Sequence, residues 1–167
     1  MRTDDNFSIT EIDNDKKQYL PLLLIGDESE TMIDRYLDSG ILYVGLFNGK
    51  PIAVCVTVNL DSDTVEIKNL SVDAEYRRHG YGRRMLEYVE SQNSNKKIIL
   101  GTGETPSTLR FYKSCGYSYS HRIPNFFMDN YPAPIIEEGV TLRDMIYLEK
   151  QINTEKMELT SPGWASL

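Results

Sequence analysis

The chain has 167 residues, of which 40% are hydrophobic and 26% charged, and its formal net charge is −7 at pH 7. These values fit one globular domain that buries a single core. The acidic balance argues against a protein that binds duplex nucleic acid, because such proteins normally present a broad basic face.

The N-terminus and the cysteines predict a cytoplasmic protein. MRTDDNFS lacks the apolar core of a signal peptide, and no apolar run approaches the length that spans a membrane. Cys55 and Cys115 form no CxxC pair, and His79 and His121 are the only histidines. We therefore expect reduced thiols, no bound metal and a location in the cytoplasm.

The first forty residues predict one strand and two helices. FSITEID (7–13) alternates as a short strand does, and Pro21 in YLPLLLIGD suits the first turn of a helix. A second helix is expected over 28–38, with Gly40 as its C-terminal cap. Its apolar stripe is formed by Met32, Ile33, Tyr36 and Leu37.

Three strands are expected next. Asn48-Gly49 joins two β-rich runs and predicts a type I′ hairpin, because that turn requires a positive φ at both positions. One face of the second arm is marked by Ile52, Val54, Val56 and Val58. After the turn DSDT, TVEIKNLSV forms the third strand.

The apolar alternation of this third strand changes phase. Val65 and Ile67 share one phase, whereas Leu70 and Val72 share the other. A period of two cannot change phase without an extra residue, so one explanation is a β-bulge near Lys68-Asn69. The alternative is a regular strand that is buried on both faces, and the pattern alone does not separate the two.

The second half of the chain alternates helices and strands. Helices are expected over 82–92 and from Thr105-Pro106 to a stop at Gly116, and KKIILGTG reads as a buried strand between them. YSYSHRI and TLRDMIYLEKQI are late strands, separated by the irregular segment RIPNFFMDNYPAPIIEEG. We therefore expect an α/β fold with a mixed, mostly antiparallel sheet of six to seven strands. It forms a single domain over 1–150, followed by a C-terminal tail over 151–167.

A basic turn stands out in this acidic chain. AEYRRHGYGRRM (74–85) holds four arginines and one glutamate, a local charge of +4 − 1 = +3 that leaves −10 elsewhere. Positive charge at a helix N-terminus is unfavourable unless an anion binds there, and glycines let backbone N–H groups approach phosphate oxygens. A solvated turn paired with Glu75 and Glu87 explains the charge equally well, but the strand-turn-helix context favours an anion site. GTGETP is a weak dinucleotide fingerprint, since Pro106 replaces the third glycine, and no Walker motif is present.

Two motifs carry a family resemblance. IKNLSVDAEYRRHGYGRRMLEYVE resembles the central motif of the GCN5-related N-acetyltransferases (the GNAT superfamily, bacterial-type small-molecule branch), whose signature [RQ]-x-x-G-x-[GA] is matched by Arg77, Gly80 and Gly82. LRFYKSCGY resembles the second block of the same family. The order of elements matches over roughly residues 7–150.

The resemblance implies the GNAT fold and acetyl-CoA as the acetyl donor. In this family the bulged strand splays from the next strand, and the pantetheine arm lies in the slot. Carried over, this assigns backbone contacts with pantetheine and the acetyl group to Leu70, Ser71 and Val72. The pyrophosphate is then held by the turn residues Arg77, Arg78, His79, Gly80, Tyr81, Gly82 and Arg83.

Acetyl transfer to an amine requires a proton to leave the ammonium and another to reach the departing thiolate. The resemblance assigns the first role to Glu66, for which the alternative is a strand residue paired with Lys68. It assigns the second role to Tyr112, the match of a family tyrosine near the CoA sulfur. The chain departs from the family at Glu104 or Thr105, where an asparagine commonly helps to bind CoA.

The sequence leaves the acceptor open. Residues 1–40 hold ten acidic and four basic side chains, and GDESE (26–30) lies where the family borders its acceptor site. An acidic rim attracts a cationic amine, but the same charges also suit a solvated surface. Phe126, Phe127 and Tyr131 either wall an acceptor pocket or form a homodimer contact.

We therefore expect an N-acetyltransferase that acts on a primary amine of a small molecule, or on a lysine or N-terminal amine. Its partners are acetyl-CoA and the amine, without nucleic acid or membrane. The alternative is a non-catalytic acyl-CoA binding or sensing domain of the same fold. A third hypothesis, an RNA-binding surface, fits the net charge least.

Overall fold

The computed structural model describes residues 6–153. Two short 3-10 helices, η1 (Lys16–Tyr19) and η2 (Ala74–Tyr76), accompany five α-helices. The α-helices are α1 (Leu20–Gly26), α2 (Glu30–Asp34), α3 (Tyr81–Ser91), α4 (Pro106–Ser114) and α5 (Phe126–Asn130). The strands are β1 (Phe7–Ile12), β2 (Ile41–Phe47), β3 (Lys50–Asn59), β4 (Thr64–Val72), β5 (Lys97–Gly103), β6 (Ser118–Ile123), β7 (Ile136–Glu137), β8 (Val140–Thr141) and β9 (Met145–Gln151).

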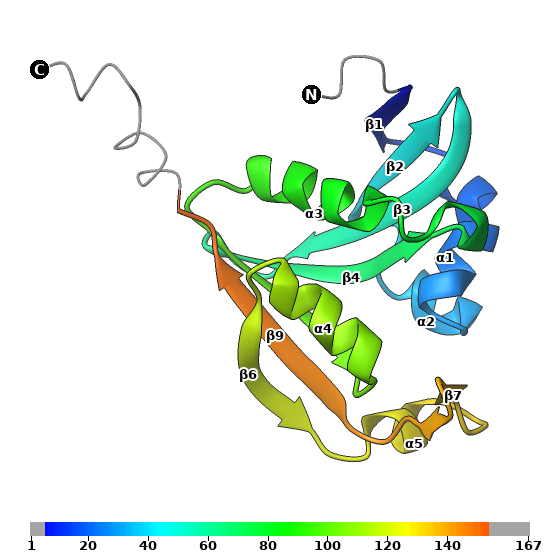
Figure 1. Cartoon of the computed structure of the whole chain (residues 1–167), viewed down its shortest axis with the longest axis vertical. Coiled ribbons are helices and arrows are strands. Elements are labelled where there is room, and N and C mark those ends of the chain that lie inside the picture. The colour runs from blue at the N-terminus through cyan, green and yellow to red at the C-terminus, as the bar shows by residue number, and fades with distance from the viewer. Residues whose placement is uncertain (1–5, 154–167) are drawn as a thin grey trace, which may run out of the picture. The chain divides into compact units, whose positions relative to one another are not determined.

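Seven of these strands form a mixed sheet in the order β1-β2-β3-β4-β5-β9-β6, and β7 and β8 form a separate hairpin (Figure 1). The predicted α/β fold with a six- to seven-stranded sheet and flanking helices is therefore confirmed. The described chain divides into two compact units. The first comprises residues 6–59 and 66–89, and the second comprises residues 60–65 and 90–153.

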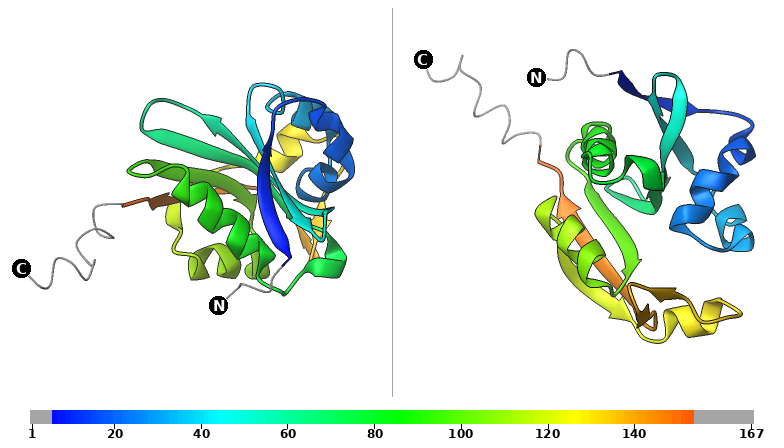
Figure 2. Two further views of the ribbon diagram at one scale, coloured as in Figure 1. Left: turned by 90° about the horizontal axis from the view of Figure 1, so that it is seen from above. Right: turned by 45° about the vertical axis from the view of Figure 1, so that its right-hand side comes forward.

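The first unit is a set of antiparallel strands with helices on both faces. β1 pairs with β2, and β2 pairs with β3 through the Asn48-Gly49 turn. Asn48 has φ 50° and Gly49 has φ 81°, so the predicted I′ hairpin is confirmed. The right-hand view of Figure 2 shows α3 on one side of β2 and β3, and α1 and α2 on the other.

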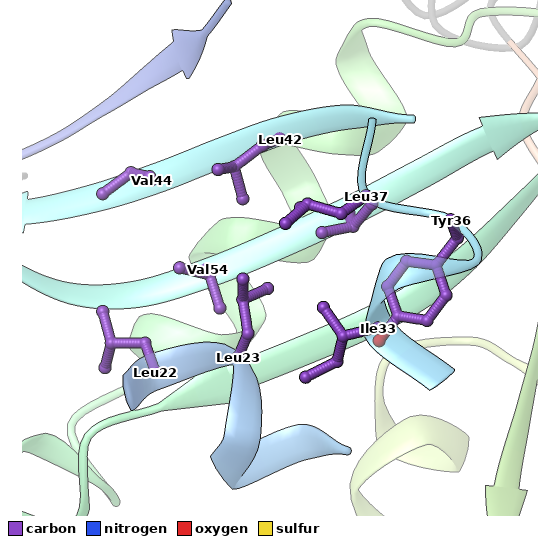
Figure 3. Close-up of a cluster of buried hydrophobic side chains, with 9 residues drawn as sticks. Leu22, Leu23, Ile33, Tyr36, Leu37, Leu42, Val44 and Val54 are labelled. Atoms are coloured by element: carbon purple, nitrogen blue, oxygen red, sulfur yellow. The ribbon is translucent and has the colours of Figure 1, made fainter. Parts of the chain in front are cut away.

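The core of the first unit lies between α1, α2 and the strands β2 and β3 (Figure 3). Its buried side chains are Leu22, Leu23, Ile33, Tyr36, Leu37, Leu42, Val44, Val54 and Val56. Side chains alternate along β2, so Tyr43 faces the other way and packs against Tyr88 of α3, with ring centroids 5.7 Å apart. Gly45 shares that face, where a β-carbon would meet the Phe7 ring and the Met85 sulfur.

The second helix is shorter than predicted. α2 begins after Ser29, whose side chain accepts a hydrogen bond from Met32 N, and the helix ends at Asp34. Turns continue to Gly40, whose N–H donates to Tyr36 O at 2.9 Å. Gly40 is not a left-handed cap. It is required because a β-carbon there would crowd the carbonyls of Tyr36 and Thr57.

The second unit places α4 alongside β6 and β9 (Figures 1 and 2). α4 begins after Thr105 with Pro106 in its first turn, and Gly116 follows it with φ 96°, as predicted. The segment predicted to be irregular contains α5 and β7, which is a correction. The helical turn forms because Phe127 is buried, and the hairpin turn because Glu138 and Gly139 have positive φ.

Two predictions about the ends of the domain stay open. β9 extends to Gln151, and Ile152 N donates to Lys96 O, so the first residues of the predicted tail are ordered. The rest of the tail lies outside the described residues. The single-domain assignment over 1–150 stays a prediction.

The assigned core predicts that two isoleucine-to-alanine substitutions lower the free energy of unfolding by unequal amounts. Ile33 is 0% exposed within the first unit, whereas Ile25 is 41% exposed. Ile33→Ala is expected to lower the free energy of unfolding by about 2–5 kcal/mol, because it leaves a cavity, and Ile25→Ala by about 1 kcal/mol or less. Urea denaturation of both variants measures the difference, and equal losses would contradict the assigned core.

Candidate active site

The basic turn begins at a fixed point, the end of β4. Asp73 N donates to Ile52 O at 2.8 Å, which ties the end of β4 to β3. The Asp73 carboxylate accepts from Glu75 N at 3.0 Å and starts η2. Arg77 Nε then donates back to Val72 O at 3.2 Å. The chain that follows is therefore held close to the last residues of the strand.

Two residues of the turn adopt left-handed backbone conformations. Arg78 has φ 66° and Gly80 has φ 84°, and α3 starts directly afterwards at Tyr81. The first helical hydrogen bond runs from Arg84 N to Gly80 O at 3.1 Å. The N–H groups of residues 81–83 therefore have no acceptor within the helix and form its positive end.

The arginines divide into two pairs. Arg77 and Arg78 are exposed, and neither forms an ion pair within residues 6–153. Arg83 and Arg84 are half-buried at the start of α3, and the Arg84 guanidinium lies 4.7 Å from the centre of the Phe7 ring. Glu75 forms no ion pair within residues 6–153, but Arg83, Arg84 and Glu87 each form interactions. The alternative in which Glu75 and Glu87 neutralise the turn therefore stays open, and only the charge of the exposed Arg77 and Arg78 faces solvent.

An aromatic cluster supports the turn from the side of β1 and β2. The Tyr81 ring lies 4.7 Å from that of Phe7, 6.1 Å from Phe47 and 6.4 Å from Tyr76, measured between centroids. The His79 ring lies 6.3 Å from Tyr81. Because the Tyr81 side chain takes part in this packing, Tyr81 can contribute only its backbone N–H to an anion site.

Burial along β4 alternates through the position of the predicted bulge, since Ile67, Asn69 and Ser71 are buried and the residues between them are half-buried. Lys68 Nζ lies 5.9 Å from the centre of the Tyr36 ring, and Asn69 Nδ2 lies 3.2 Å from the Tyr36 hydroxyl. Consecutive residues of a regular strand point to opposite faces. Both nevertheless reach the same tyrosine, so the bulge near Lys68-Asn69 stays a prediction.

Glu66 is buried and paired. Glu66 is 8% exposed, and its Oε2 lies 3.4 Å from Lys68 Nζ. The ion pair with Lys68, considered above as the alternative, is therefore present. An incoming ammonium would have to share this carboxylate with Lys68, and a role in proton removal stays a prediction.

Tyr112 occupies a defined place in the second unit. It lies on α4, is 8% exposed, and packs edge-on against Phe111 and Tyr117 at 5.1 Å and 5.9 Å. Tyr117 N donates to Tyr112 O at 3.0 Å, and Tyr117 Oη donates to Glu90 at 3.0 Å. Glu90 also binds Lys150, whose Nζ donates to Cys115 O. These bonds fix the end of α4, while the action of the Tyr112 hydroxyl stays a prediction.

The cysteines agree with the expected reduced state. Both are free and buried, and burial raises the pKa of the Cys55 thiol to about 12. Cys115 contributes its carbonyl to the bond with Lys150. The Cys55 thiol therefore lacks the depressed pKa that a nucleophile would need.

The second unit contains a pocket that the sequence did not predict. Its volume is about 500 Å³, and it is lined by Glu104, Arg122, Val140, Thr141, Leu142, Arg143 and Asp144. Arg122 binds both oxygens of Glu104, at 3.2 Å and 3.0 Å, and Asp144 Oδ2 at 2.7 Å. The bonds to Glu104 and then Asp144 raise the pKa of Arg122, and the pKa of Asp144 is lowered by the N–H of Asn125 and by Arg122.

The three charged residues meet because of strand register. Gly103 of β5 and Ile123 of β6 both lie opposite Met145 of β9. Their neighbours Glu104, Arg122 and Asp144 are therefore brought to one edge of the sheet. The predicted wall residues do not line this pocket. Phe127 instead packs against Phe126 and Tyr131, with centroids 5.4 Å and 5.8 Å apart.

Known proteins resemble the chain over most of its length. The family model described as "Acetyltransferase (GNAT) domain" matches residues 38–119. The uncharacterized N-acetyltransferase YvbK of Bacillus subtilis (strain 168) is 30% identical over 131 residues, which are 76% of this chain and 84% of that protein.

Solved structures agree. A GNAT family acetyltransferase from Elizabethkingia anophelis with acetyl-CoA bound has a TM-score of 0.84 and 36% identity, covering 89% of this chain and 99% of that one. An IAA acetyltransferase from Bacillus cereus ATCC 14579 has a TM-score of 0.80 and 30% identity, covering 87% and 99%. A Bacillus subtilis acetyltransferase in complex with CoA has a TM-score of 0.78 and 26% identity, again covering 87% and 99%.

The chain belongs to the GNAT superfamily of acetyltransferases. It is an acetyl-CoA-dependent acetyltransferase, and acetyl-CoA is its acetyl donor. Within residues 6–153, no helix has the length and apolar character needed to cross a membrane.

The geometry of the turn predicts a glycine substitution with a matched control. Gly80 and Gly49 both have positive φ, and a β-carbon at either position would have no neighbour within 4 Å. Alanine at each position is therefore expected to cost about 1–2 kcal/mol of backbone strain without a steric clash. Only Gly80→Ala is expected to reduce the rise in melting temperature that acetyl-CoA causes, because only Gly80 shapes the turn. Equal rises in both variants would show that Gly80 has no part in binding.

Proposed function

We propose that this acetyltransferase transfers the acetyl group of acetyl-CoA to a primary amine of a small molecule, or to a lysine or N-terminal amine. The observation that carries the proposal is the left-handed turn at Arg78 and Gly80, which joins the end of β4 to the N-terminus of α3. It concentrates positive charge in a protein of net charge −7. Such a turn suits a pyrophosphate group.

Acetyl-CoA would be held mainly by backbone groups of the first unit. The N–H groups from Arg78 through Arg83 would bind the pyrophosphate, with the exposed guanidinium groups of Arg77 and Arg78 beside them. Leu70 and Val72 are half-buried at the end of β4, which supports a backbone role in holding pantetheine. The Ser71 hydroxyl donates to Asn69 Oδ1 at 2.7 Å, so we propose that Ser71 contacts pantetheine only through its backbone.

The reaction forms a C–N bond and breaks the thioester C–S bond. Two protons leave the acceptor nitrogen, one before attack and one from the tetrahedral adduct, and one proton reaches the CoA sulfur. Acetyl-CoA supplies the acetyl group as a thioester. Glu66 would accept the proton of the acceptor ammonium, because a protonated amine has no lone pair to attack a carbonyl. A backbone N–H near Leu70 would stabilise the oxyanion, and the Tyr112 hydroxyl would donate a proton to the departing thiolate.

A cationic acceptor is supported by charge alone. Lys17 binds Glu30 and Asp34, which neutralises part of the acidic N-terminal region, and hydrogen bonds to Asp34 and then Glu30 raise the pKa of Lys17 to about 12. Asp27 and Glu28 lie in the α1–α2 junction, where Asp27 accepts hydrogen bonds from Tyr36 and from Ser29 N. A solvated surface explains these charges as well. We place the protein in the cytoplasm on its free, buried cysteines, and a homodimer stays a prediction.

The proposal is tested by thiol release from acetyl-CoA across a panel of polyamines, aminoglycosides and lysine peptides. Tyr112→Phe is expected to lower kcat by about 10²-fold, because it removes a general acid, while acetyl-CoA affinity changes little. Tyr119→Phe is the control, since that tyrosine is 59% exposed. Unchanged turnover of Tyr112→Phe would remove this hydroxyl from the mechanism. Acetyl-CoA binding without thiol release on any amine would contradict the proposed acceptor class.

A substitution of Glu66 tests the proposed removal of a proton from the acceptor amine. Glu66→Gln keeps the shape of the side chain but cannot take a proton, so kcat/KM for the amine is expected to fall by about 10²-fold. Glu149→Gln is the control, because Glu149 is also a strand glutamate paired with a lysine, Lys97, at 3.8 Å. Stopped-flow detection of thiol release compares the two. If Glu66→Gln and Glu149→Gln retain the same activity, a water relay or another group removes the proton.

A further inference from the structure

A chain of polar side chains is buried in the core of the first unit. Tyr36 is 6% exposed, Asn69 is 4% exposed and Ser71 is 4% exposed. Tyr36 follows α2, whereas Asn69 and Ser71 lie on β4, where apolar side chains would pack more simply. Figure 3 shows Tyr36 at the edge of the apolar cluster, with its hydroxyl beside Ile33.

The hydrogen bonds run in one direction from Ser71 to Asp27. Ser71 Oγ donates to Asn69 Oδ1 at 2.7 Å. Asn69 Nδ2 donates to Leu23 O at 2.9 Å and to the Tyr36 hydroxyl at 3.2 Å. The Tyr36 hydroxyl donates to Asp27 Oδ2 at 3.2 Å, and Asp27 Oδ1 accepts from Ser29 N at 3.2 Å. This series of hydrogen bonds therefore links β4 to the α1–α2 junction, residues 26–30.

Gly26 shows how closely the junction approaches β4. A β-carbon built on Gly26 would overlap Ser71 Oγ and Asn69 Oδ1, the two atoms that form the first bond of the chain. Its φ is not in the left-handed region, so the glycine is needed for space and not for backbone conformation. Any larger residue at position 26 must displace one of these two side chains.

The two ends of this series of hydrogen bonds, Ser71 and Asp27, lie in segments with different expected roles. Ser71 lies between Leu70 and Val72, whose backbone is proposed to hold pantetheine. Asp27 belongs to the acidic junction, which is proposed to border the acceptor. Since Asn69 uses both of its N–H groups and its oxygen, it can hold these segments in only one relative placement.

We propose that Tyr36 and Asn69 are positioning residues for acetyl transfer, and that they couple the acetyl-CoA-binding end of β4 to the α1–α2 junction. This role rests on the proposed function of β4. Acetyl-CoA bound along Leu70–Val72 stabilises the end of the strand, and the hydrogen-bond chain transmits that stabilisation to the junction. The acceptor side is thereby ordered when the acetyl donor is bound.

Hydrogen–deuterium exchange of the full chain, with and without acetyl-CoA, tests the coupling without a known acceptor. The amides of Asp27, Ser29 and Ile33 report on the junction, and those of residues 70–83 report on acetyl-CoA binding. In the wild type, acetyl-CoA is expected to slow exchange several-fold in both regions. In Tyr36→Phe, which keeps the ring but loses the hydroxyl, it is expected to slow exchange only in residues 70–83.

Tyr43→Phe is the matched control. Tyr43 is also a buried tyrosine of the first unit, and its hydroxyl is hydrogen-bonded to Thr57, away from the junction. This variant is expected to behave like the wild type in both regions. Loss of junction protection in Tyr43→Phe as well would mean that the effect is general destabilisation, and would overturn the proposal.

Gly26→Ala perturbs the same chain from the α1 side and is expected to reproduce the effect of Tyr36→Phe. The coupling is overturned if acetyl-CoA protects the junction equally in Tyr36→Phe and the wild type, or if it protects residues 70–83 of the wild type but never the junction. If acetyl-CoA protects neither region of the wild type, the proposed acetyl-CoA site itself is wrong, and the coupling is wrong with it. The two failures are therefore distinguishable.

Discussion

The end of β4 is the constraint on which the rest of the first unit depends. Asp73 N remains bound to Ile52 O of β3, so the strand cannot leave the sheet before Val72. Within a few residues the backbone must then reverse into α3, which packs Met85, Leu86 and Val89 into the core. Left-handed residues at Arg78 and Gly80 make that reversal. The proposed anion site therefore lies where strand and helix packing already demand an unusual turn.

β4 also shows how a buried strand can carry polar side chains. Asn69 and Ser71 would each be costly in an apolar core if their hydrogen-bonding groups had no partners. Their bonds to Leu23 O, to Tyr36 and to each other remove that cost, but only while α1 and α2 stay in place. Such residues specify one arrangement more strictly than leucine or valine would, since an apolar side chain tolerates small shifts of its neighbours.

The parts of the structure that follow from local rules could be predicted from the sequence. The Asn48-Gly49 hairpin, the start of α4 at Thr105-Pro106 and the turn at Gly80 each depend on the backbone preferences of a few neighbouring residues. The end of α2 and the α5 turn could not, because burial of Tyr36 and Phe127 decides them. The phase change in β4 was visible, but Asn69 and Ser71 gave no sign of their partners. The pocket at Arg122 was not predictable either, since strand register unites three distant charges.

The contrast between features set by local backbone preferences and features set by distant side chains explains why family membership establishes the acetyl donor but not the acceptor. The proposed acetyl-CoA contacts are mostly backbone N–H groups, which need glycine and a left-handed turn but few particular side chains. A chain that is 30–36% identical to its relatives can therefore keep that site intact. The proposed acceptor side is formed instead by side chains such as Asp27, Glu28 and Glu66. Because Tyr36 and Asn69 tie Asp27 to β4, we expect substrate preference to depend on a few residues of the α1–α2 junction and their buried supports.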